Sequence, residues 1–365
     1  MFNIEEFLTK VNKTNASDIH LKIGKVPSLR IAGNIVKIDE PPITEEDFEN
    51  ILNTMLYGNL AQKIKEKNDI DFTYEIKGVS RYRVNYCKEL GYPKLTLRTI
   101  PYVIPTLEEL SLPNSLEIFT KYNNGIVLIT GATSSGKSTT IASLIEIINK
   151  EKAKHIVTIE DPIEFLYTDK KCLITQRGVG VDVNSFSDGI KYALRQDPDI
   201  IVVGEIRDRD TMESALNAAE TGHLVFSTIH TNSASQTINR ILGLFDDSTR
   251  TFIRDRFAKV LRGTIAQKLI PRVNNAGLAP ALEIMSSTPA IVDYIQKNQM
   301  EEVDLSIKRG GSQNMVSMNA SIFKLFKGGI IDKDAALNAS DDTTELNQMM
   351  RGIYHGSANP VDDLL

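Results

Sequence analysis

The chain has 365 residues, with 42 lysines and arginines against 47 aspartates and glutamates, which leaves a formal net charge of −5. This length suits two domains better than one, and an acidic chain without a long basic run is poorly suited to binding a nucleic-acid backbone. Two distant cysteines exclude a four-cysteine zinc site and suit a reducing compartment. No apolar run reaches the ~18 residues of a membrane span, and the first residues are acidic, unlike those of a signal peptide. We therefore expect a cytoplasmic protein without an integral membrane segment.

Residues 1–100 follow the pattern of a small α+β domain. Apolar residues at helical spacing predict a short opening helix, and Thr44 with Asp47 at the capping-box position begins a second helix. Alternating residues on both sides of Gly33-Asn34 predict a β-hairpin. Three further alternating segments predict strands at residues 71–76, 81–86 and 94–100.

Three arginines, Arg81, Arg83 and Arg98, fall on the polar phase of these alternating strands. The pattern alone favours a solvated strand face. The alternative is functional, because three planar guanidinium groups on one sheet face could bind a polyphosphate held by another domain or subunit.

Prolines at positions 101, 105 and 113 mark a boundary, so we expect a linker at residues 101–112 and a second domain at residues 113–365. There the pattern changes to strands alternating with helices, which predicts a parallel sheet. The expected strands are 126–130, 155–160, 200–204 and 223–229, and the expected helices are 137–150, 186–196, 209–220 and 234–243. Beyond residue 250 the pattern indicates mostly helices, followed by a loose tail from Tyr354.

The segment Gly131–Thr139 fits the phosphate-binding pattern G-x-x-x-x-G-K-S/T, with an apolar strand before it and a helical pattern after it. Backbone N–H groups in such a loop point at the phosphates, and the following helix adds its positive dipole end. We expect Lys137 to neutralise the β- and γ-phosphates of ATP and Ser138 to bind Mg²⁺. The predicted nucleotide-binding residues are Gly131, Thr133, Ser134, Ser135, Gly136, Lys137, Ser138 and Thr139.

Carboxylates gather where the next expected strand ends, at Glu160, Asp161 and Glu164. Such a group beside a P-loop is costly unless metal or water uses it. We expect Glu160 and Asp161 to support the metal. A P-loop hydrolase also needs a group that orients and deprotonates the attacking water, and Glu164 is our first choice. A charged turn held by Pro162 is the alternative.

The apolar run 200–203 ends in Gly204-Glu205 and has the form of a Walker B strand. Gly204 stands where many P-loop enzymes have an aspartate, so we expect Glu205 to serve Mg²⁺ through a water molecule. Next along the chain, His223 and His230 bracket another apolar run. Sheet ends in such folds face the nucleotide, so both histidines are candidates for holding a γ-phosphate, with a purely structural role as the alternative.

These segments together resemble the type II/IV secretion ATPases, and most closely the type IV pilus retraction ATPases. The resemblance rests on Ser17–Leu21, Arg81–Asn85 with Leu97–Ile100, the P-loop, an "Asp box" at Thr158–Phe165, the Walker B segment Ile201–Asp208 and a "His box" at Thr221–Thr231. Four boxes in the same order and at matching spacing are far more specific than a P-loop alone.

The resemblance implies a PAS-like N-terminal α+β domain and a RecA-like P-loop ATPase domain with a helical C-terminal region, assembled as a homo-hexamer. ATP and Mg²⁺ would lie between the domains, with Arg81, Arg83 and Arg98 supplying charge. Glu164 would activate water and Glu205 would support Mg²⁺. The ring would act on an inner-membrane platform protein from the cytoplasmic face and withdraw pilin subunits.

Two departures from the family pattern bear on these expectations. The P-loop has Ala132 and Ser134 in place of proline and glycine, and serine is tolerable there if its φ is negative. The retraction signature Ala-Ile-Arg-Asn-Leu-Ile-Arg-Glu is present only as Ala290–Lys297, in which both arginines are lost. An accessory retraction protein, a motor for pilus assembly, type II secretion or DNA uptake, and a nucleotide-gated scaffold therefore remain alternatives.

Overall fold

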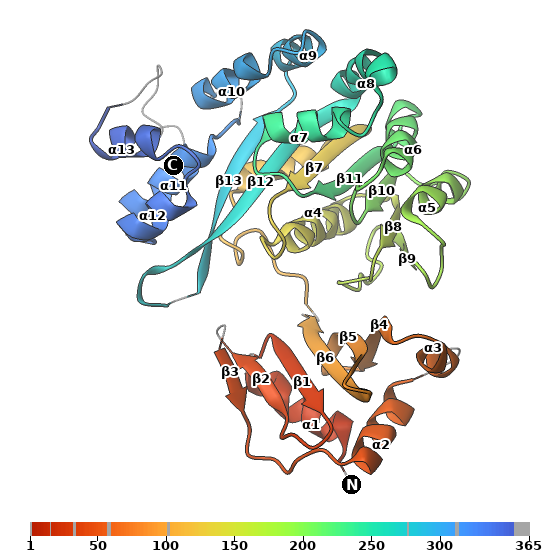
Figure 1. Cartoon of the computed structure of the whole chain (residues 1–365). Helices are drawn as coiled ribbons and strands as arrows, with labels where there is room; N and C mark the ends of the chain where they lie inside the picture. Colours follow the sequence, from red (N-terminus) through yellow and green to blue (C-terminus); the bar gives the residue numbers. More distant parts are fainter. Residues whose placement is uncertain are drawn as a thin grey trace. The chain divides into compact units, whose positions relative to one another are not determined.

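The computed structural model describes residues 2–14, 16–31, 34–56, 60–100, 103–275, 277–310 and 314–353. The predicted tail from Tyr354 and the turn at Ala32-Gly33 lie outside these residues. The chain divides into two compact units, one formed by Met1–Val103 with Pro162–Leu166 and the other by Ile104–Asp161 with Tyr167–Leu365 (Figure 1).

The first unit contains a six-stranded antiparallel sheet in the order β3-β2-β1-β6-β5-β4. Its strands are β1 (Asp18–Lys22), β2 (Ser28–Ile31), β3 (Asn34–Lys37), β4 (Asp69–Ile76), β5 (Ser80–Glu89) and β6 (Tyr92–Ile100). Its helices are α1 (Ile4–Val11), the 3₁₀ turn η1 (Asn12–Thr14), α2 (Glu45–Met55) and α3 (Leu60–Glu66). The expected hairpin is confirmed by the antiparallel pairing of β2 with β3.

One face of this sheet is apolar and packs against the helices, because alternate residues of each strand point to the same side. Tyr82 and Val84 of β5 are fully buried with Leu8 of α1 and Ile51 of α2. The predicted capping box starts α2, since Thr44 accepts from the Asp47 amide and the Asp47 carboxylate accepts from the Thr44 amide. The α+β class expected for this part of the chain is confirmed.

The second unit is built on a seven-stranded sheet in the order β13-β12-β7-β11-β10-β8-β9. Its strands are β7 (Gly125–Thr130), β8 (His155–Glu160), β9 (Leu173–Gly178), β10 (Ile200–Val203), β11 (Leu224–Ile229), β12 (Leu261–Pro271) and β13 (Leu278–Ser286). All neighbouring strands are parallel except β12 and β13. This is the mostly parallel sheet that the pattern predicts, in the RecA-like arrangement that the family resemblance implies.

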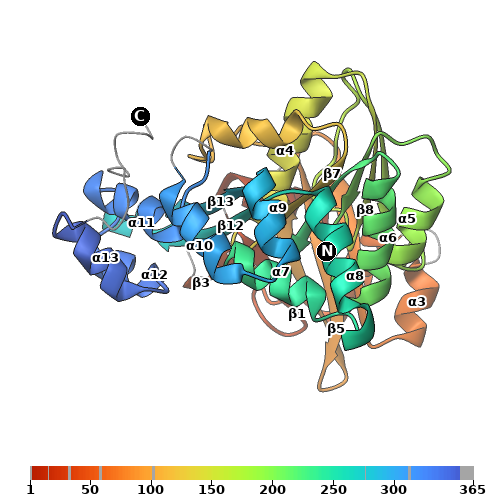
Figure 2. The same ribbon diagram turned by 90° about the horizontal axis from the view of Figure 1, so that it is seen from above.

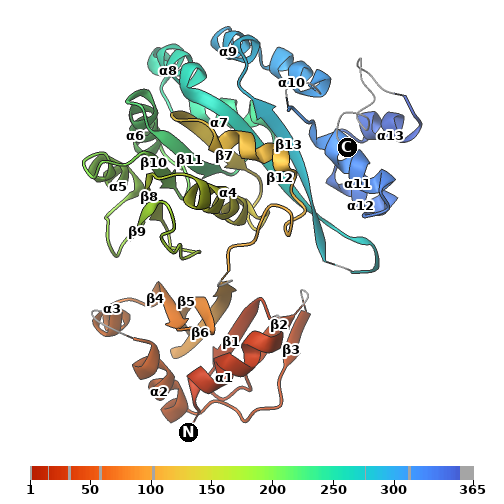
Figure 3. The ribbon, with the colours of Figure 1, turned by 180° about the vertical axis from the view of Figure 1, so that it is seen from behind.

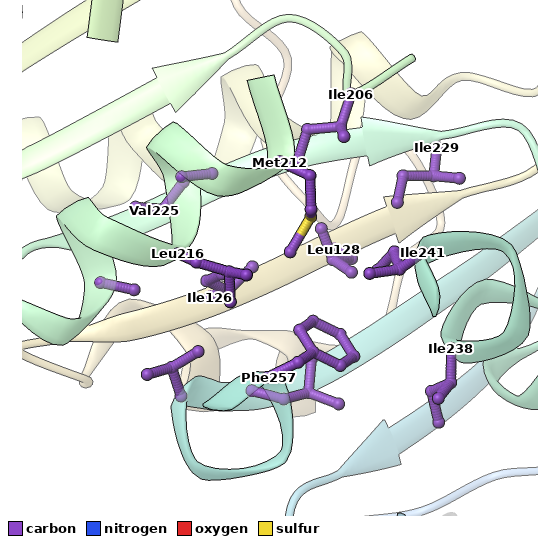
Figure 4. Close-up of a cluster of buried hydrophobic side chains, with 14 of the residues drawn as sticks. Ile126, Leu128, Ile206, Met212, Leu216, Val225, Ile229, Ile238, Ile241 and Phe257 are labelled. Atoms are coloured by element: carbon purple, nitrogen blue, oxygen red, sulfur yellow. The ribbon is translucent and has the colours of Figure 1, made fainter. Parts of the chain in front are cut away.

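Helices cover both faces of this sheet (Figure 2). On one face lie η2 (Asn114–Thr120) and α4 (Lys137–Glu151), and on the other lie α5 (Phe186–Ala193), α6 (Arg209–Glu220), α7 (Ala234–Leu242) and α8 (Asp247–Val260). Figure 4 shows Leu128 of β7 among Met212 of α6, Ile241 of α7 and Phe257 of α8. Each such side chain contributes about 1.5–3 kcal/mol when fully buried, so β7 is strongly anchored.

After β13 the chain continues as α9 (Pro289–Gln296), α10 (Met300–Arg309), α11 (Met318–Lys327), α12 (Lys333–Ala339) and α13 (Thr343–Met350). The last three helices pack on the β12–β13 hairpin, as Figure 3 shows. In the part of the chain that the structure describes, no helix combines the length and the apolar character needed to cross a bilayer.

The expectation of a mostly helical chain beyond residue 250 is wrong for residues 261–271 and 278–286, which form β12 and β13. Helix α8 ends at Val260 and β12 begins at Leu261, so no turn residue separates the two elements. In addition, β12 has apolar residues on both faces, so its sequence lacks the alternation of apolar and polar residues that would indicate a strand. Strand β9 was not expected either.

Replacing Gly263 of β12 by alanine should destabilise the second unit. A Cβ there would lie 2.3 Å from Phe119 Cε1 and 2.5 Å from the Met285 carbonyl oxygen, and the latter cannot move without breaking the sheet. We expect a loss of about 3 kcal/mol, at the upper end of overpacking effects, measured by urea denaturation. Gly243→Ala is the control, because its nearest contact is 3.2 Å and its φ is −69°, and it should change stability by less than about 1 kcal/mol. Equal losses in the two variants would contradict this account.

Candidate active site

The P-loop joins β7 to α4 and depends on two glycines. Gly131 has a φ of 143° and Gly136 a φ of 89°, in the region that side chains disfavour. Gly136 is the N-cap of α4, and because glycine has no side chain, the N-cap residue cannot occupy the first-turn amides with a capping bond. A helix start of this kind is a ready-made site for phosphate.

Ser134 lies between these glycines with a φ of 64°. The condition stated for replacing glycine by serine, a negative φ, is therefore not met. A left-handed conformation costs a residue with a Cβ roughly 1–2 kcal/mol. The loop stores this strain at its exposed tip, where Ala132 and Thr133 are also exposed.

Lys137 begins α4, and its side chain returns over the loop. Only 7% of the residue is exposed, and Nζ donates to the Gly131 carbonyl at 3.0 Å and the Ala132 carbonyl at 2.7 Å. Ser138 is exposed on the same helical turn and Thr139 is half-buried, whereas Ser135 is buried within the loop. The ammonium group and the open amides therefore occupy one small region.

The carboxyl ends of the parallel strands bring three further predicted residues to the same edge of the sheet. Glu160 ends β8 and accepts from Thr158 Oγ1 at 2.7 Å and Gln176 Nε2 at 3.2 Å. Glu205 follows β10, and His230 follows β11. This convergence results from the parallel topology, since every strand in this region ends on the side where the P-loop begins.

Glu205 lies between two basic side chains, those of Arg207 and His230. His230 Nε2 lies 3.4 Å from one carboxylate oxygen, and Arg207 forms an ion pair with the other. The Glu205 side chain is only 13% exposed, so its orientation is restricted. The pairing connects the Walker B and His boxes directly.

Asp161, Glu164 and His223 are the remaining predicted residues of the ATPase boxes. Asp161 is exposed directly after β8, and Glu164 belongs to the segment 162–166 that is grouped with the first unit. His223 precedes β11 and lies at the amino edge of the sheet, where its Nδ1 is 2.9 Å from the Ala218 carbonyl oxygen. The argument that both histidines end their strand on the nucleotide side is therefore wrong for His223, because a strand has its two ends at opposite edges.

The three arginines share one face of the first unit's sheet, as expected. Arg83 lies opposite Arg98 in the β5–β6 register, and Arg81 is two residues away on β5. Carboxylates partly neutralise this face, because Arg98 Nε is 2.9 Å from Asp18 Oδ1 and Arg83 is 3.8 Å from Asp71. The buried Nε of Arg81 has no hydrogen-bond partner among the described residues. Whether these groups act on a nucleotide stays a prediction.

Sequence reasoning missed two polar residues on the hairpin, the buried Gln267 of β12 and the partly buried Glu283 of β13. Glu283 accepts a hydrogen bond at 2.8 Å from the Ala234 amide at the start of α7, four residues after His230. Burial, with smaller contributions from Asp304 and Asp341, raises the pKa of Glu283 to about 7. The one sequence signal that could have indicated their position is an alternation of apolar residues around them, which would have predicted strands there.

An open sheet with a P-loop on the inner strand β7 and acidic residues at the ends of β8 and β10 defines a P-loop ATPase. The family model described as "Type II/IV secretion system protein" matches residues 2–310, and the chain belongs to this family of ATPases. The resemblance and the fold class stated from the sequence are thereby confirmed.

Relatives are similar over nearly the whole chain. The "Type IV pilus retractation ATPase PilT" of Pseudomonas aeruginosa is 38% identical over 334 residues, which are 92% of this chain and 97% of that protein. The "Type IV pilus ATPase PilU" of the same organism is 32% identical over 360 residues, or 99% and 94%. The crystal structure of the pilus retraction motor PilT with bound ADP has a TM-score of 0.89 at 40% identity, covering 96% of this chain and 100% of that chain. The Legionella pneumophila ATPase DotB has a TM-score of 0.78 at 29% identity, with 95% of each chain covered.

Glu283→Gln should change how stability depends on pH. The folded pKa is about 7, whereas an unfolded glutamate titrates near about 4.3. Between these pH values the Glu283 carboxyl is ionised in the unfolded wild type but protonated in the folded one. The free energy of unfolding of the wild type therefore falls by up to about 3 kcal/mol as pH rises through this window. The variant cannot titrate, so its stability relative to the wild type should improve by that amount from pH 4 to pH 7.5 in urea denaturation. The control is the exposed Glu301→Gln on α10; a pH-independent difference for Glu283→Gln would refute the assignment.

Proposed function

We propose that this ATPase is the motor that powers type IV pilus retraction. The observation that carries the proposal is the similarity over almost the full length to PilT and to its ADP-bound crystal structure. The convergence of Lys137, Glu160, Glu205 and His230 at one sheet edge supports it, because this arrangement suits hydrolysis of a nucleotide as well as its binding.

In this proposal the loop amides and Lys137 hold the triphosphate. Ser138 and Glu205, with Glu160 and Asp161 at the end of β8, offer the hard oxygen donors that suit Mg²⁺, which would neutralise phosphate charge when bound. No group of three histidine, cysteine or acidic residues that could hold a metal occurs among the described residues, which fits a cation bound largely through phosphate and water. Glu164 accepts the proton of the attacking water, and His230 orients Glu205.

The assembly part of the proposal is a homo-hexameric ring. Residues 1–100 act as a PAS-like domain, joined by the linker 101–112 to the ATPase domain 113–365, and Arg81, Arg83 and Arg98 stabilise charge on a nucleotide held between domains. The ring lies at the cytoplasmic face of the inner membrane, acts on a pilus platform protein there and binds no nucleic acid. The net charge of −5 supports the last point.

A second candidate function is an accessory role in retraction. It is favoured by the segment Ala290–Lys297, at α9, which lacks both arginines of the retraction signature. In that case the protein assists another retraction motor.

Deleting the gene in its host should produce cells with excess surface pili and little twitching motility, because assembly would continue unopposed. Expression of the wild-type gene should restore motility, whereas Lys137→Ala and Glu164→Ala should not, and both purified variants should lose nearly all ATP turnover. Electron microscopy of pili and phosphate release give the two measurements. Bare cells would instead indicate an assembly motor, and unchanged pilus number with weak retraction would favour the accessory role.

Arg98→Ala should slow ATP hydrolysis at least tenfold, because a charge-stabilising arginine can contribute roughly 10³–10⁵ in rate. Arg30→Ala is the matched control, since Arg30 also lies 3.9 Å from Asp18 on the same unit. Steady-state ATP turnover at saturating nucleotide is the measurement. Equal slowing in both variants would mean that Arg98 acts only through Asp18.

A further inference from the structure

Gln267 reaches the P-loop through the register of the sheet. Strand β12 runs parallel to β7 with Ala266 opposite Thr130, so the next residue along each chain places Gln267 beside Gly131. Ile265, two residues earlier, packs in the core on the α4 side, and alternation along the strand puts the Gln267 side chain on that side too. Gln267 is only 4% exposed.

The contacts of Gln267 involve three separate parts of the nucleotide-binding segment. Thr140, fully buried on α4, donates its hydroxyl to Gln267 Oε1 at 2.7 Å. A Cβ on Gly136 would lie 2.8 Å from Gln267 Nε2, and one on Gly131 would lie 2.4 Å from the Gln267 carbonyl oxygen. The first and last glycines of the motif are therefore both in contact with one residue of a distant strand.

A buried carboxamide is costly unless it is hydrogen-bonded, and leucine would fill the same space without that cost. Gln267 lies on the same strand face as Ile265 and Leu269, which are both apolar, so its own polar group is the exception at this position. Its polar group thus has a specific use, which is to tie the first turns of α4 to β12. Loop amides bind phosphate well only when they are already oriented, because affinity falls with the fraction of protein in the competent state.

We propose that Gln267 is a positioning residue of this ATPase, which keeps the P-loop and the start of α4 in the phosphate-binding conformation without touching the nucleotide. It acts through Thr140 and through packing on Gly131 and Gly136. The proposal concerns nucleotide binding and does not depend on pilus retraction, so its failure is distinguishable from failure of the proposed motor role.

The test compares Gln267→Ala, Thr140→Val and the double variant with the full-length wild type. Loss of one buried hydrogen bond corresponds to a change of about fivefold to tenfold, so we expect each single variant to weaken binding of a fluorescent ADP analogue and to raise the KM for ATP by that factor, with kcat within about twofold. The double variant should bind the ADP analogue no more weakly than the single variant with the lower affinity, because the two changes remove the same interaction. Thr140→Ser keeps the hydroxyl that Thr140→Val removes, so it should bind the ADP analogue with the affinity of the wild type.

The matched control is Asn149→Ala, which removes another buried carboxamide at the opposite end of α4, where Asn149 donates to the Thr168 carbonyl at 2.9 Å. It should lower the melting temperature without changing affinity for the ADP analogue. The proposal is overturned if Gln267→Ala and Thr140→Val behave like this control, with affinity within twofold of the wild type. If Gln267→Ala does not fold, Thr140→Val against Thr140→Ser decides alone.

Discussion

The site of the second unit depends on backbone amides of the P-loop and the start of α4 that are not hydrogen-bonded within the helix and point toward one phosphate-binding position. Gly131 and Gly136 adopt left-handed conformations that free the amides at the start of α4, and β7 anchors the loop because its side chains are buried on both faces of the sheet. Preorganised dipoles stabilise charge without reorganisation at the moment of binding. The rigidity of the sheet is therefore part of the chemistry of the site.

The charges around this loop are already paired within the protein. Lys137 donates to loop carbonyls, and Glu205 lies between His230 and Arg207. A phosphate oxygen is a stronger partner for an ammonium group than a neutral carbonyl, so a nucleotide would draw Lys137 away from the loop. The arginine face of the first unit is partly neutralised in the same manner, with Asp18 bound to Arg98.

Several features were predictable because each is encoded within a few neighbouring residues. The P-loop needs its glycines, Lys137 and a following helix in one short segment, and the capping box at Thr44 and Asp47 spans a single turn. Strands β7, β8, β10 and β11 are short apolar runs between polar turns, so their positions follow from hydrophobicity. The family boxes then connected these segments to an ATPase, which the comparisons confirmed.

Other features exist only because distant segments meet. β12 is a strand because β7 and β13 supply its hydrogen bonds, and no local pattern separates it from α8. Its register alone brings Gln267 to the P-loop, and burial by several elements, with smaller contributions from Asp304 and Asp341, raises the pKa of Glu283. The sequence by itself determined which groups can bind phosphate. The sheet topology decided which of them share an edge, including His230 and excluding His223, because side-chain proximity depends on strand order and direction.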